Sequence, residues 1–152
     1  MSLRDRISTE LKSAMKARDG ARLSTLRLIS AAIKDRDIAA RSDGEDDGVS
    51  EDEVLSLLIK MVKQRNESAR TYEEAGRLEL AAGERAEVEV IETFLPRQLD
   101  DAEIDAAIDA EIKALGASSM RDMGRVIGAL KAKYAGRMDF GKVGPRVKAR
   151  LG

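Results

Sequence analysis

Apolar residues recur at helical spacing along almost the whole chain. Leu3, Ile7 and Leu11 follow one another at intervals of four, and similar stripes continue through most of the 152 residues. This interval matches one turn of an α-helix, whereas the strict alternation typical of strands is missing. The pattern therefore predicts an all-α protein, with an N-terminal four-helix part and a small C-terminal three-helix unit. The four N-terminal helices are expected at about residues 3–18, 21–40, 51–75 and 77–94.

Local signals set the ends of these helices. Gly20 is expected to break the first helix and Gly76 the third, while Ser50 and Glu53 have the spacing of a capping box. In the fourth helix, the buried stripe is expected to include Ala86, Val90 and Phe94.

Periodicity is lost between Arg41 and Gly48, where acidic residues, Ser and Gly dominate. Such a composition predicts an exposed acidic loop. A calcium loop is the alternative, but the ligand spacing of an EF-hand is missing, so a solvated linker is the preferred interpretation. The acids concerned are Asp43, Glu45, Asp46, Asp47 and Glu51.

Pro96 marks the joint between the two parts of the chain. Its ring and its missing N–H group stop a helix near Phe94 or Leu95. The predicted domains are therefore residues 1–95 and 96–152, with Leu95, Pro96 and Arg97 as the hinge.

The three C-terminal helices have their own signals. Asp100 and Glu103 form a capping box, and Gly116 has the place of a glycine that ends a helix. Asp139 is the expected cap of the last helix, with Phe140, Val143, Val147 and Leu151 facing inward. Because Pro145 suits only the first turn of a helix, the regular helix is expected to begin between this cap and Gly144. Gly124 and Gly128 lie one turn apart, which favours close packing of another helix, with a phosphate backbone as the alternative neighbour.

Charged residues are distributed unevenly along the chain. Residues 113–152 contain ten Lys and Arg residues against two Asp residues, a net charge of +8, although the whole chain has a net charge of −1. Dense positive charge of this kind is typical of a surface that binds a polyanion, and a solvated helical surface is the alternative. The candidate nucleic-acid contacts are Arg121, Arg125, Lys131, Lys133, Lys142, Arg146, Lys148 and Arg150.

Composition excludes several kinds of chemistry. The chain has no Cys and no His, so it offers no disulfide, thiolate nucleophile or imidazole base. The sequence indicates no catalytic residues, no metal ligands and no cofactor. It contains no secretory signal and no long apolar run, so we expect no membrane association and a cytoplasmic location.

Five short motifs follow one another along the chain: Leu26–Lys34, Lys63–Ser68, Ala75–Arg77, Phe94–Leu99 and Asp122–Gly128. In this order they resemble the GatB/YqeY family of small helical proteins. The resemblance implies an all-α fold whose C-terminal unit is similar to the tail of the GatB subunit of tRNA-dependent amidotransferase. In those enzymes the tail contacts tRNA away from the chemistry.

The resemblance thus implies a non-catalytic tRNA-binding module, with tRNA and an aminoacyl-tRNA synthetase or amidotransferase as partners. One alternative is carbon–nitrogen ligase activity with glutamine as amide donor, either alone or as an enzyme subunit. We expect no independent catalysis, because the chain lacks a phosphate-binding loop and a nucleophile with a base. A helical protein-interaction adaptor is the other alternative.

Overall fold

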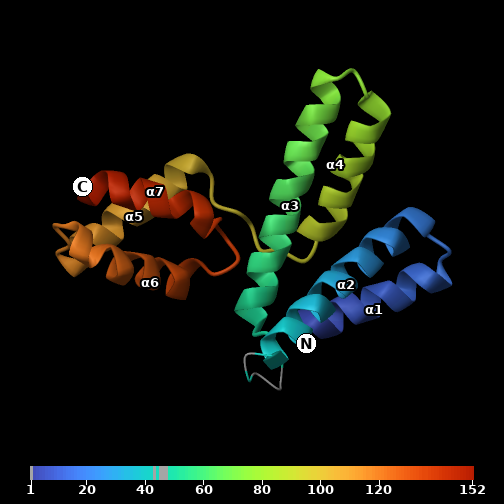
Figure 1. Cartoon of the computed structure of the whole chain (residues 1–152), viewed down its shortest axis with the longest axis horizontal. Coiled ribbons are helices and arrows are strands. Elements are labelled where there is room, and N and C mark those ends of the chain that lie inside the picture. Colours follow the sequence, from blue (N-terminus) through green and yellow to red (C-terminus); the bar gives the residue numbers. More distant parts are fainter. Residues whose placement is uncertain (1, 43, 45–47) are drawn as a thin grey trace. The chain divides into compact units, whose positions relative to one another are not determined.

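The computed structural model describes residues 2–42, 44 and 48–152. Every regular element within these residues is helical, as the sequence predicts (Figure 1). The elements are α1 (Leu3–Lys16), α2 (Gly20–Ser42), α3 (Glu51–Glu74), α4 (Leu78–Glu92), α5 (Asp101–Leu115), the 3₁₀ turn η1 (Met120–Asp122), α6 (Met123–Tyr134) and α7 (Phe140–Leu151). Four acids of the predicted loop, Asp43, Glu45, Asp46 and Asp47, lie outside the described residues.

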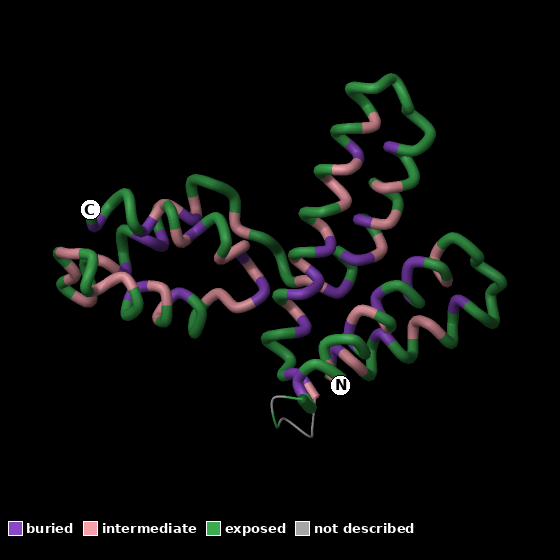
Figure 2. Tube along the Cα trace, in the orientation of Figure 1, coloured by how far each residue is buried: buried purple, intermediate pink, exposed green. Residues whose placement is uncertain are grey.

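The chain forms two compact units, Met1–Pro96 and Arg97–Gly152. In the first unit, α1 and α2 form one helical hairpin, and α3 and α4 form another (Figure 1). Their apolar stripes meet in one core around Leu26, Ile29 and Leu58, all of which are fully buried. Figure 2 shows the buried positions along the inner sides of these helices.

In the second unit, α5, α6 and α7 surround a separate core. Ile108, Val126, Leu130 and Val143 are completely buried there. Each helix contributes one apolar stripe, since positions three, four and seven residues apart share a face.

Several predicted caps are confirmed. The Ser50 hydroxyl accepts a hydrogen bond from the backbone N–H of Glu53 at 3.2 Å. Asp100 and Glu103 form a reciprocal capping box, and Gly116 ends α5 in the left-handed conformation with φ of 62°. These signals were readable because each depends only on residues within one turn.

Three local predictions are wrong. Gly20 does not end α1: the left-handed residue after this helix is Arg18, and Gly20 already belongs to α2. Ala86 is exposed, because α4 buries Ala81, Val88 and Ile91 instead.

The third concerns Pro145. The predicted cap, Asp139, is confirmed, and α7 begins at Phe140, so Pro145 lies in the second turn of the helix rather than in the first. The ring of a proline inside a helix crowds the residues that lie one and four positions before it. Here both are glycines, Gly141 and Gly144, which have no side chains to clash.

Candidate nucleic-acid interface

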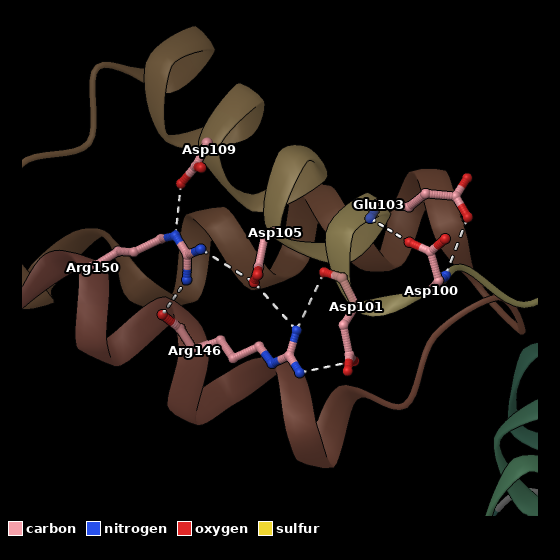
Figure 3. A network of polar contacts seen from close by, with 7 residues as sticks. All are labelled: Asp100, Asp101, Glu103, Asp105, Asp109, Arg146 and Arg150. Carbon is pink, nitrogen blue, oxygen red and sulfur yellow. Dashed lines mark hydrogen bonds and ion pairs between the residues drawn. The ribbon is translucent and has the colours of Figure 1, made fainter.

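Two of the predicted phosphate contacts form an ion-pair ladder between α5 and α7 (Figure 3). Arg146 lies 2.9 Å from the carboxylate of Asp101 and 3.2 Å from that of Asp105. Arg150 lies 3.1 Å from Asp105 and 2.6 Å from Asp109. Acids and arginines are both spaced four residues apart, so each set lies on one face of its helix. The ladder holds three negative and two positive charges and therefore leaves no excess positive charge.

The arginines of the ladder are less exposed to solvent than its acids. Their side chains are 29% exposed, whereas the side chain of Asp101 is 80% exposed. Arg150 also donates to the backbone carbonyl of Arg146 at 3.3 Å. Its hydrogen bond to Asp109 raises the pKa of the Arg150 guanidinium, so this group stays charged. Arg146 and Arg150 thus fasten α7 to α5, and a phosphate group would have to displace carboxylates to reach them.

Two further predicted contacts have acidic partners within the unit. Arg125 lies 2.9 Å from Asp122, whose carboxylate also accepts from the backbone N–H of Ser118 at 3.0 Å. That backbone hydrogen bond is the main reason why the pKa of Asp122 is lowered. Lys133 pairs with Glu111, and this hydrogen bond raises the pKa of Lys133.

The other four predicted contacts are exposed and have no ion pair with any residue in the described part of the chain. We call them the open cations: Arg121, Lys131, Lys142 and Lys148. Lys131 has an aromatic neighbour, with its Nζ 5.9 Å from the centre of the Phe140 ring. The structure thus separates the eight predicted residues into four with acidic partners and four with solvent-facing charge.

The glycines of α6 face open space. Apart from the backbone of α6 itself and the flanking residues, a Cβ atom added to Gly124 or Gly128 would meet no atom of the described residues within 4 Å, so no other helix of the described chain packs closely against this pair. Lys131 follows Gly128 by three residues and lies on the same side of α6 as Gly124 and Gly128, while Arg121 lies in η1, just before this helix. An external ligand can therefore approach the α6 backbone between two open cations.

The predicted hinge residues belong to different units. Leu95 packs against the core of the first unit, and Pro96 is its last residue. Arg97 belongs to the second unit, where its guanidinium binds Glu103 through two hydrogen bonds of 2.9 Å. The carboxylate of Glu103 consequently has its pKa lowered to about 2, mainly by the hydrogen bond from Arg97.

Sequence reasoning did not assign a role to Arg137, although it lies in the basic segment. Its Nε donates to the carbonyl of Arg97 at 3.1 Å, and its own carbonyl accepts from the N–H of Leu99 at 2.9 Å. Its guanidinium also lies 5.9 Å from the centre of the Tyr134 ring. These contacts join residues about forty positions apart, and no local sequence signal reveals them.

Neither a metal centre nor a membrane segment is found in the described residues. No group of three or more Asp and Glu side chains there could hold a metal ion. None of the helices formed by those residues is both long enough and apolar enough to cross a bilayer.

Comparison with protein families matches residues 4–151 to the YqeY-like proteins. Among curated proteins, the altered inheritance of mitochondria protein 41 of Lachancea thermotolerans is 31% identical over 104 residues, covering 67% of this chain and 54% of the relative. The protein of the same name from Clavispora lusitaniae is 34% identical over 107 residues, covering 70% and 56%. The corresponding Pyrenophora tritici-repentis protein is 26% identical over 135 residues, covering 87% and 71%. The chain thus spans about half the length of the first two relatives, and all three carry the word mitochondrial in their names.

Proposed function

Because the chain belongs to the YqeY-like protein family, we propose that it is a non-catalytic RNA-binding protein whose C-terminal unit engages the phosphate backbone of folded tRNA. The observation that supports this most directly is the set of open cations, Arg121, Lys131, Lys142 and Lys148. These charges have no acidic partner within the described chain, so they remain available to an external polyanion. The family's relationship to the C-terminal region of GatB agrees with this proposal.

The composition of the unit favours a folded RNA over a single strand. Single-strand binding depends on aromatic side chains that stack on bases. The only aromatic residues in this unit are Tyr134 and Phe140, and both pack against its core. Binding through Lys and Arg would instead be led by phosphate position and by RNA shape, and would weaken steeply with salt.

The proposal extends to location and partners. An aminoacyl-tRNA synthetase or an amidotransferase is the expected class of protein partner. The sequence suggests the cytoplasm, whereas the names of the relatives suggest mitochondria; tRNA is the ligand in either compartment.

A helical protein-interaction adaptor is the second candidate. The open face at Gly124 and Gly128 favours it, because glycines without internal neighbours allow an external helix to approach closely. The two candidates differ in their response to salt. Phosphate contacts are lost as salt rises, whereas apolar helix packing persists.

The test is fluorescence anisotropy of labelled tRNA with the chain of residues 1–152 across a salt series. The test variant replaces the four open cations by Gln. The control variant removes the same charge from four exposed residues of the first unit, again by substitution with Gln: Arg36, Lys60, Arg70 and Arg77. The proposal predicts that the test variant loses at least about tenfold in affinity and that its log–log salt slope flattens by up to about 0.9 per lost contact. Equal affinities for the test and control variants would contradict it.

A further inference from the structure

The turn between α1 and α2 holds a cation in a conformation that usually requires glycine. Arg18 has φ of 55°, whereas every other left-handed position among the described residues is a glycine. The turn has the hydrogen bonds of a regular helix end, with Arg18 N–H donating to Met15 and Asp19 N–H donating to Ala14. Any side chain with a Cβ is disfavoured at such a position. The chain therefore accepts a conformational cost and retains a positive charge at the tip of this hairpin.

Further cations follow the same hairpin. Lys12 and Lys16 are exposed on α1, and Arg27 and Lys34 are exposed on α2. None of them, nor Arg18, forms an ion pair with a residue that the structure describes. We call these five residues the α1–α2 basic surface.

A groove between α1 and α2 is lined by one of these cations, Lys34. It has a volume of about 200 Å³, and its lining also includes Ser8 of α1, Ser30 of α2 and the ion-paired residues Arg4 and Asp37. Lys12 lies one turn after Ser8, and Arg27 lies one turn before Ser30, so both continue the two edges of the groove toward Arg18.

Two acids of this hairpin are engaged, because Glu10 pairs with Arg22 and Asp37 lies 2.6 Å from Arg4. Asp5, Asp19 and Asp35 are exposed and form no ion pair with a residue that the structure describes. The five cations of the α1–α2 basic surface thus outnumber the three unpaired acids of the same hairpin.

We propose that the α1–α2 basic surface is a second phosphate-binding surface, for the backbone of the same folded RNA. This inference rests on the proposed function only in taking RNA as the ligand. Residues 2–42 contain no Phe, Tyr or Trp, so the surface offers no platform on which bases stack. The RNA must then be held by its phosphates. Because both surfaces belong to one chain, binding of the second increases the affinity for a ligand that reaches both.

The experiment uses the chain of residues 1–152, labelled tRNA and the control variant described above. The hairpin variant is Lys12→Gln, Lys16→Gln, Arg27→Gln and Lys34→Gln. Relative to the control, it is expected to bind tRNA about tenfold more weakly, with a salt slope flatter by up to about 0.9 for each lost contact. A separate variant, Arg18→Gly, isolates the charge from the strain. This variant is expected to have a higher melting temperature, because glycine relieves the strain of the left-handed conformation. It is also expected to bind tRNA about twofold or more weakly, with a log–log salt slope that is flatter by about 1, the value for one lost phosphate contact.

The outcomes separate this inference from the proposed function. If the hairpin variant matches the control and Arg18→Gly matches the wild type, the α1–α2 surface is not an RNA contact. If the hairpin variant loses affinity and the variant lacking the open cations does not, the proposed function fails and the second surface stands. If the hairpin variant still binds tRNA but no longer binds vesicles of phosphatidylglycerol, the surface contacts an anionic membrane and the inference is overturned. Failure of the wild type to bind tRNA at low salt would overturn both proposals.

Discussion

The carboxylate of Glu111 is almost fully buried, and Lys133, whose side chain is 60% exposed, is its ion-pair partner. Removing the exposed partner leaves a buried negative charge uncompensated. We therefore expect Lys133→Ala to lower the melting temperature of the protein by several degrees. The double variant Lys133→Ala with Glu111→Leu should recover most of this loss, since it removes the buried charge as well. A melting temperature of the single variant equal to that of the wild type would show that Glu111 does not depend on Lys133.

The ladder predicts a variant that weakens the fold without weakening RNA binding. Asp105 is shared between Arg146 and Arg150, so Asp105→Asn loosens both ion pairs. Because Asp105 is 43% exposed, the expected loss is modest, about 1 kcal/mol in the free energy of unfolding. Urea denaturation measures this loss, and it should shrink in 1 M salt, which screens exposed charges. Asp35→Asn, at an exposed position on α2, is the matched control. If tRNA affinity falls in Asp105→Asn but not in the control, the ladder itself takes part in binding.

Gly48 is expected to tolerate no side chain. It has φ of 83°, and an added Cβ would lie 2.6 Å from Oδ1 of Asp37. This oxygen accepts from the N–H of Val49 and from Arg4, so it cannot move without losing these hydrogen bonds. Gly48→Ala should therefore cost about 2 kcal/mol or more in stability, measured by urea denaturation. Gly83→Ala, where an added Cβ meets nothing within 4 Å inside α4, should be neutral or stabilising. Similar losses in the two variants would contradict the steric explanation.

Acid should weaken the first unit through Asp37. The hydrogen bond from Arg4 and that from Val49 lower the pKa of this carboxyl from 3.8 to about 2. A carboxyl whose pKa is depressed in the folded state stabilises the protein above its unfolded pKa, and this contribution is lost as pH falls from about 4 toward 2. After allowance for solvent screening, it amounts to about 1 kcal/mol at neutral pH.

The variant Asp37→Asn tests this assignment. It should be less stable than the wild type at pH 7 and should approach it at pH 2, as followed by thermal melts across this range. Glu89→Gln, on the exposed side of α4, should show no such convergence. A constant difference between wild type and Asp37→Asn at all pH values would mean that ionisation of this carboxyl contributes nothing.

The sequence predicted those features that depend on neighbours within a helical turn. Ser50, Asp100 and Gly116 are examples, since a cap requires only the residues next to it. The left-handed turn at Arg18 escaped prediction because the nearby Gly20 offered the more obvious break.

The distribution of the basic charge could not be predicted from the basic segment alone. Arg146 and Arg150 meet acids of α5 that lie about forty residues earlier. A signal for this pairing existed, because Asp101, Asp105 and Asp109 repeat with the same four-residue spacing as the arginines. It becomes visible only when the two helices are considered together.

The contacts of residues 97–99 also determine where a gene encoding this protein can be divided. Arg97, Gln98 and Leu99 all bond to the turn at residues 136 and 137, and these bonds lie wholly on the C-terminal side of Pro96. Recombination at the Pro96–Arg97 junction severs none of them, whereas a crossover three codons later removes all of them. A gene segment that begins at Arg97 therefore encodes both partners of each of these three hydrogen bonds, and we expect them to persist when residues 97–152 are joined to a different N-terminal sequence.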